Sequence, residues 1–151
     1  MVVLKTESET VFHEAEELLR LFLGMTMVRA EAVDAEPVSY TICIETTCEN
    51  GQWRAAAKES SRQLQSSATY PVLGQDLLLQ RRAQSRAVKF ALFQLMKQLL
   101  PQSNTPWGAL TGIRPTKLLY EYMGRGLSAQ EAGNILREDY GVRQDKVEIL
   151  L

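Results

Sequence analysis

The chain has 151 residues, of which 45% are hydrophobic and 23% are charged. This composition is that of a globular protein large enough to bury a core, and it excludes a disordered chain. The net charge is −1, from 17 basic and 18 acidic residues, which provides no general attraction for nucleic acid. No run approaches the ~20 apolar residues of a membrane span. The start MVVLKTESET does not have the pattern of a secretory signal, so we expect a cytoplasmic protein without a membrane partner.

The N-terminal part of the chain predicts a strand, a helix and a second strand. Residues 1–6 are rich in valine and favour a short strand. Apolar residues within 11–22 recur at three- and four-residue steps, which predicts an amphipathic helix. Thr6 and Glu9 have the spacing of a capping box at the start of this helix. Residues 27–33 then alternate between apolar and polar side chains as a strand does.

Residues 38–59 carry the clearest hairpin signal in the chain. Asn50-Gly51 supplies the two positive-φ residues that a type I′ turn needs, so the segments on either side should pair. Counting outward from the turn sets Cys48 opposite Trp53. Side chains alternate between the two faces of a sheet, and only one face is apolar here. The expected buried face carries Tyr40, Ile42, Ile44 and Trp53.

A loop and a long helix are predicted next. Residues 60–71 are rich in Ser and Gln and lack a period, which is typical of a loop. Residues 75–100 carry an apolar stripe at helical spacing, which predicts a long helix against the core. Arg82, Arg86 and Lys89 lie on one face of this helix. Two interpretations stay open: this face contacts a phosphate backbone or an acidic partner, or it is a solvated face opposite the core.

The rest of the chain predicts short helices, and the order of elements predicts an α+β fold. Pro115 suits the first turn of one helix, Ser128 and Glu131 form a capping box before a second, and VRQDKVEILL begins a third. We expect a mainly antiparallel sheet of about four strands with one face covered by two helices, followed by short C-terminal helices. If the first two strands are neighbours, they are parallel. Residues 1–104 should form the α+β domain and residues 105–151 a helical segment.

The sequence contains no recognisable catalytic or metal-binding pattern. His13 and Glu17 share a helical face, but no further metal ligand accompanies them, so a solvated face is the simpler interpretation. Cys43 and Cys48 are separated by an odd number of residues and should point to opposite faces of a strand. We therefore expect two reduced structural thiols, and no catalytic residue, metal or cofactor in this chain.

The most informative segment is Trp107–Leu119, WGALTGIRPTKLL, which crowds turn and basic residues between two predicted helices. A helix that begins near Pro115 leaves backbone amides unpaired at its positive end, which suits a carboxylate or a phosphate. The candidate residues for binding an anion or docking a neighbouring domain are Trp107, Thr111, Gly112, Arg114 and Lys117.

A purely local role for the same segment stays open beside these two. Trp107 and Leu110 can anchor the turn in the core, and Gly112 can supply a special backbone angle. Arg114 can pair with an acidic side chain such as Glu121 or Asp139.

The segment resembles the N-terminal region of HemZ-type proteins, radical-SAM relatives of oxygen-independent coproporphyrinogen III oxidase. Their pattern reads Trp-Gly-x-Leu-Thr-Gly-Ile-Arg-Pro-Thr-Lys-Leu. It is matched without a gap by Trp107, Gly108, Leu110, Thr111, Gly112, Ile113, Arg114, Pro115, Thr116, Lys117 and Leu118. The match continues at lower density through Ser128, Ala132, Leu136, Asp139 and Tyr140.

The resemblance implies a haem-biosynthesis oxidoreductase of which this chain is an N-terminal accessory domain. In the family, a Cys-x-x-x-Cys-x-x-Cys motif holds a 4Fe-4S cluster that binds S-adenosylmethionine. This chain lacks the motif, so both cofactors would belong to the parent protein's C-terminal catalytic domain, which is the expected partner. Residues 1–104 would pack on or orient that domain, and residues 105–151 would lead to it. Two alternatives remain: a module that binds anions or nucleic acid, and a radical-SAM relative with a non-porphyrin substrate.

Overall fold

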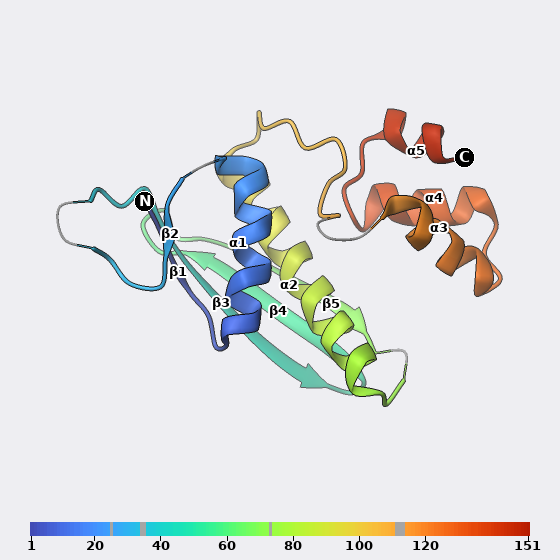
Figure 1. The fold of residues 1–151 in the computed structure, drawn as a ribbon, viewed down its shortest axis with the longest axis horizontal. Helices are drawn as coiled ribbons and strands as arrows, with labels where there is room; N and C mark the ends of the chain where they lie inside the picture. The colour runs from blue at the N-terminus through green and yellow to red at the C-terminus, as the bar shows by residue number, and fades with distance from the viewer. Residues whose placement is uncertain (25, 34–35, 73, 111–113) are drawn as a thin grey trace. The chain divides into compact units, whose positions relative to one another are not determined.

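The computed structural model describes residues 1–24, 26–33, 36–72, 74–110 and 114–151. They form two compact units, Met1–Ser103 and Asn104–Leu151. In Figure 1 the first unit contains the strands and two long helices, and the second contains three short helices. None of the helices in the described ranges has the length and apolar character that crossing a membrane requires.

The first unit is built on a mixed sheet with the strand order β2-β1-β3-β4-β5. The strands are β1 (Val2–Lys5), β2 (Val28–Arg29), β3 (Tyr40–Glu49), β4 (Gln52–Glu59) and β5 (Leu64–Pro71). β1 is parallel to both β2 and β3, whereas β4 is antiparallel to both β3 and β5. The α+β class and the parallel pairing of the first two strands are confirmed. The expectation of a mainly antiparallel, four-stranded sheet is met only in part, because both pairings of β1 are parallel and the sheet has five strands.

Helices α1 (Glu9–Leu23) and α2 (Leu77–Leu99) lie over one face of the sheet, in front of the strands in Figure 1. Between these helices and the sheet lies the core of the unit. Its fully buried side chains include Leu4, Ala15, Leu18, Leu19, Ile42, Ile44, Ala55, Ala57, Leu92 and Leu95. Burial of a Leu or Ile side chain of this kind contributes about 1.5–3 kcal/mol to stability.

The hairpin prediction is confirmed in turn type and register. Asn50 and Gly51 have φ angles of 53° and 72°, as a type I′ turn requires, and Cys48 pairs with Trp53. Ile42 is fully buried, whereas Cys43 points to the opposite face and is half-buried. Trp53 is half-buried, and its Nε1 donates to a glutamine side chain of α2 at 3.2 Å.

Residues 60–71, expected to be a loop, contain strand β5. A two-residue alternation is present but muted, because small and polar residues occupy both faces. Leu64, Ser66, Ala68 and Tyr70 are half-buried or buried, and the residues between them are exposed. The Ser66 hydroxyl donates to the carbonyl of Ala91 in α2, so a polar side chain lies on the helix-covered face without remaining unpaired.

Two boundaries near the N-terminus also differ from the expectation. Ser8, not Thr6, caps α1, because its backbone is extended (φ −147°) and its hydroxyl accepts from the Val11 amide at 3.2 Å. Thr6 instead donates its hydroxyl proton to the Ser8 carbonyl at 2.8 Å. The second strand covers only Val28–Arg29, rather than residues 27–33.

The last residue of β4, Glu59, has a buried carboxylate. Glu59 is 1% exposed and accepts hydrogen bonds from the Thr41 amide at 3.3 Å and the Arg62 amide at 2.8 Å. Burial alone would raise the pKa of Glu59, but the hydrogen bonds to its carboxylate outweigh burial and lower the pKa. The charged form of Glu59 therefore stabilises the junction between β4 and β5.

The second unit contains helices α3 (Pro115–Gly124), α4 (Ala129–Glu138) and α5 (Gln144–Leu150). Pro115 occupies the start of α3, as predicted. The capping box of Ser128 and Glu131 is confirmed, with the hydroxyl accepting from one amide at 3.1 Å and the carboxylate from the other at 2.9 Å.

Candidate functional site

The first part of the segment, Trp107–Leu110, binds the turn between α4 and α5. The Ala109 amide donates to the carbonyl of Tyr140 at 2.8 Å, and the Arg143 amide donates to the carbonyl of Pro106 at 2.8 Å. These two hydrogen bonds clamp the chain before α3 against the turn before α5. We call this contact the backbone clamp.

Gly108 is required at the centre of the backbone clamp for two reasons. Its φ of 60° lies in the left-handed region, which favours glycine over residues with a side chain. A Cβ atom at this position would lie 2.1 Å from the carbonyl oxygen of Tyr140 and 2.7 Å from that of Gly141. No side chain fits at such distances, so the Trp-Gly pair has a structural role in this unit.

Trp107 and Leu110 contribute to the same local structure. Leu110 is 9% exposed, and Trp107 is half-buried with the Lys146 ammonium 5.7 Å from its ring centre. Beneath the clamp, the hydroxyl oxygens of the buried Tyr122 and Tyr140 are 3.1 Å apart. These contacts favour the local interpretation for Trp107, one of the residues that the sequence suggested for binding or docking.

The middle of the segment, residues 111–113, includes the candidates Thr111 and Gly112 and lies outside the described residues. The predictions for Thr111 and Gly112 therefore stay predictions.

The last part of the segment forms the start of α3 and is exposed. Arg114 precedes the helix with extended backbone (φ −76°, ψ 123°), and the first helical hydrogen bond runs from the Leu118 amide to the Arg114 carbonyl at 3.2 Å. The amides of Thr116 and Lys117 precede this bond, so they lie at the unpaired, positive end of the helix. Arg114, Thr116 and Lys117 are all exposed.

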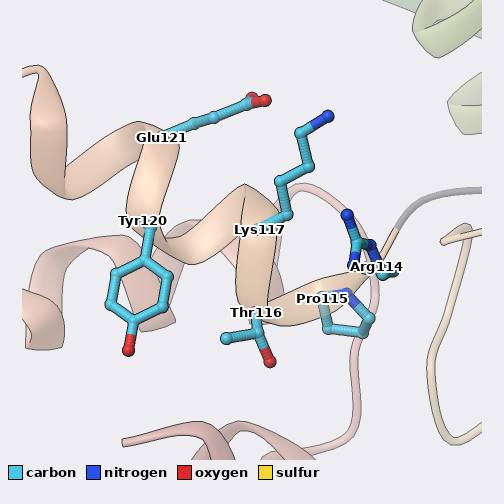
Figure 2. A pocket seen from close by; sticks show the side chains of 6 residues that line it. All are labelled: Arg114, Pro115, Thr116, Lys117, Tyr120 and Glu121. Carbon is cyan, nitrogen blue, oxygen red and sulfur yellow. The ribbon is translucent and has the colours of Figure 1, made fainter.

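An open depression of about 800 Å³ adjoins this helix start. It is lined by Arg114, Pro115, Thr116, Lys117, Tyr120 and Glu121. In Figure 2, Lys117 and Glu121 extend to one side of α3, whereas Thr116 and Tyr120 extend to the other. Tyr120 is 64% exposed, so the depression combines cations with an exposed aromatic ring.

Arg114 and Lys117 supply the positive charge of this site. Neither Arg114 nor Lys117 forms an ion pair or side-chain hydrogen bond with another residue that the structure describes. The suggested pairing of Arg114 with Asp139 or Glu121 is therefore not observed. We call Arg114 and Lys117 the cationic pair. It can attract an anionic group.

The structure agrees with neither interpretation of the basic face expected on α2. Arg82 is exposed, but Arg86 and Lys89 are 9% and 7% exposed. The Arg86 guanidinium donates to the Tyr70 hydroxyl at 2.6 Å. Burial lowers the pKa of Lys89, although the carboxylate of Glu14 opposes this shift. Arg86 and Lys89 thus belong to the interior, and their long apolar stems account for this placement.

Sequence reasoning missed the acidic member of this group. Glu14 on α1 has its pKa raised by burial, against the opposing effects of a hydrogen bond with Ser85 and the charge of Lys89. By sequence it lies on the polar side of the helix, beside His13, Glu16 and Glu17. The only available signal was its position four residues before Leu18, a core residue, since i and i+4 share a helix face.

The described residues contain no cluster of three or more His, Cys, Asp or Glu side chains that could hold a metal ion. Cys43 and Cys48 are both free thiols, and their odd spacing on β3 directs them to opposite faces of the sheet. Together they do not fit the thiolate set of an iron-sulfur cluster, which needs several cysteines around one centre.

The described part of the site thus combines an exposed cationic helix start with a backbone clamp between residues 106–109 and the turn before α5. In comparisons with known proteins, the chain is 43% identical over 44 residues to the oxygen-independent coproporphyrinogen-III oxidase-like protein HemZ of Bacillus subtilis (strain 168). The aligned part covers 29% of this chain and 9% of that protein. Over this part, the chain is HemZ-like. No family model and no solved structure matches the chain.

Proposed function

We propose that this chain is an accessory N-terminal region of a HemZ-like protein with a role in haem biosynthesis. The observation that carries the proposal is the similarity to the coproporphyrinogen-III oxidase-like protein HemZ. The parent protein would carry the 4Fe-4S cluster and S-adenosylmethionine on its own catalytic domain. The described residues of this chain supply folded structure and a recognition surface, which suits an accessory role in the cytoplasm.

Within this role, the cationic pair docks the catalytic domain. Arg114 and Lys117 are exposed and have no described partner, so their charge is available to an acidic surface. The backbone clamp holds residues 106–109, and fixing a segment before association reduces the entropy lost on docking. Loss of Arg114 should therefore weaken the effect of the accessory region without unfolding it.

The test uses the full-length parent protein in an anaerobic reaction with coproporphyrinogen III, S-adenosylmethionine and a reductant. Arg114→Ala should lower the rate of protoporphyrinogen formation, whereas Arg125→Ala should leave it unchanged. Arg125 is a matched control, because it is exposed at the opposite end of α3, with its guanidinium over the Tyr122 ring. Equal rates for the parent and both variants would refute docking through Arg114.

A second candidate function is binding of an anionic ligand by the cationic pair. Coproporphyrinogen carries propionate groups, and S-adenosylmethionine carries a carboxylate; either suits a guanidinium beside unpaired helix amides. The same reaction distinguishes the candidates. An increase in KM for one of these two ligands at constant kcat would indicate ligand binding, whereas a lower kcat at constant KM would indicate docking.

Two further alternatives have less support. Binding of nucleic acid would need a broader cationic surface, and the burial of Arg86 and Lys89 removes the basic face suggested for it. A non-porphyrin substrate is favoured if the parent protein cleaves S-adenosylmethionine but leaves coproporphyrinogen III unchanged.

A further inference from the structure

The sheet of the first unit has one edge that is protected and one that is open. At the protected edge, β2 has only two residues. Where β3 continues beyond the end of β1, Glu7 covers the edge of β3. The Glu7 carboxylate accepts hydrogen bonds from the Thr46 amide at 3.2 Å and from the Thr46 hydroxyl at 3.3 Å. Short strands and charged side chains are common ways to prevent edge pairing. The other edge, β5, has neither feature.

Strand β5 presents a row of outward backbone groups. The type I′ turn closes on the pair Glu49–Gln52, whose backbone groups face each other. From this pair on, the N–H and C=O groups of successive residues point alternately to the two sides of each strand. Gln65, Ser67 and Thr69 therefore direct their N–H and C=O groups away from β4. A side-chain hydrogen bond to the Gln65 carbonyl, from Gln98 at 3.3 Å, agrees with this direction.

These outward groups are accessible, except that the Gln65 carbonyl already accepts from the Gln98 side chain. Gln65, Ser67 and Thr69 are exposed, and their amides have no backbone partner among the residues that the structure describes. The strand LQSSATYP contains no charged residue, so nothing on it repels an identical strand. An open, uncharged edge eight residues long is a template for pairing with another strand.

We propose that β5 pairs antiparallel with β5 of a second copy of this chain, with the two-fold axis at Ser67. In this register Ser67 lies opposite its own copy, and Gln65 lies opposite Thr69 of the other copy. Each of these pairs exchanges two hydrogen bonds, so every outward amide finds a partner. The contact is self-complementary, as two-fold symmetry requires.

The neighbouring registers contain incomplete pairs, which favours this one. A shift that sets Gln65 opposite Pro71 leaves both Gln65–Pro71 pairs with a single hydrogen bond, because proline has no amide proton. A shift in the other direction sets both Thr69 residues opposite Gln63, which lies beyond the regular strand, since β5 begins at Leu64. On the helix-covered face, the selected register brings Ser66 of one copy opposite Ala68 of the other. Both side chains are half-buried in the single chain, and this pairing would bury them further.

Sedimentation of the 151-residue chain tests the proposal directly. As the concentration rises from about 1 µM to about 1 mM, the mass should increase from 17.0 kDa towards twice that value. Ser67→Lys places two ammonium groups across the axis and should weaken association by about tenfold or more. Thr47→Lys is the control, because it adds the same charge to the same exposed face of the sheet, but on β3 and away from the β5 edge.

Mixing Ser67→Lys with Ser67→Glu tests the position of the axis. Each variant alone should be monomeric, and the mixture should form a heterodimer, because opposite charges then face each other. Ser67→Pro should also be monomeric and folded, since it removes only an outward amide from an edge strand. A monomer at every concentration overturns the proposal, and the β5 edge would then be available for pairing with a strand of a different protein. A dimer that tolerates Ser67→Lys overturns it as well.

Discussion

Substitution of Gly108 by alanine tests the backbone clamp. Alanine at a φ of 60° costs about 1–2 kcal/mol. In addition, its Cβ cannot remain 2.1 Å from the Tyr140 carbonyl oxygen, so the hydrogen bond from the Ala109 amide must break. Leaving a buried donor and acceptor unpaired costs about 1–3 kcal/mol. The free energy of unfolding should therefore fall by about 3 kcal/mol in total.

Gly126→Ala is the matched control for this experiment. Gly126 has a φ of 97°, but no heavy atom lies within 4 Å of the position that a Cβ atom would take, so alanine there carries only the backbone cost. Urea unfolding followed by Trp107 fluorescence in a Trp53→Phe background reports on the second unit, since these are the two tryptophans of the chain. Equal destabilisation by the two substitutions would refute the close approach of Gly108 to Tyr140.

Four further substitutions test the exposed site, the hairpin register and the buried carboxylate of Glu59. Arg114→Ala should change the free energy of unfolding by less than about 0.5 kcal/mol, because the side chain is exposed; a loss of ~3 kcal/mol in urea unfolding would show a buried partner. Ile42→Ala should cost about 2–5 kcal/mol by the same method, whereas Cys43→Ala, on the opposite sheet face, should cost clearly less; equal costs would contradict the register. Glu59→Gln should cost about 1–3 kcal/mol at neutral pH. The lowered pKa of Glu59 makes its carboxylate stabilising above the ordinary value of 4.5, so this difference should shrink as the pH falls through the folded-state pKa; a constant difference would refute the role of its charge.

The sequence predicts the elements whose signals are local. The Asn50-Gly51 turn, the capping box of Ser128 and Glu131, and the start of α3 at Pro115 each depend on a few adjacent residues, and each is confirmed. Strand order and the position of β1 depend on contacts between distant segments, which no local pattern contains. Strand β5 was missed because small and polar side chains on both faces hide its alternation.

The same distinction applies to the candidate site. Arg114 and Lys117 were expected near the start of a helix, and the structure places them there with exposed side chains. The role of Gly108 needed the structure, because the Tyr140 carbonyl that excludes a side chain lies far along the chain. Likewise, the burial of Arg86 and Lys89 cannot be inferred from charge, since a helix face of cations is usually solvated.

The most direct test of the proposed function is the anaerobic conversion of coproporphyrinogen III by the full-length parent protein. We predict that protoporphyrinogen forms in the presence of S-adenosylmethionine and a reductant, and that Arg114→Ala slows its formation while Arg125→Ala does not. Cleavage of S-adenosylmethionine without any porphyrin product, or no reaction with either compound, would contradict the assignment to haem biosynthesis.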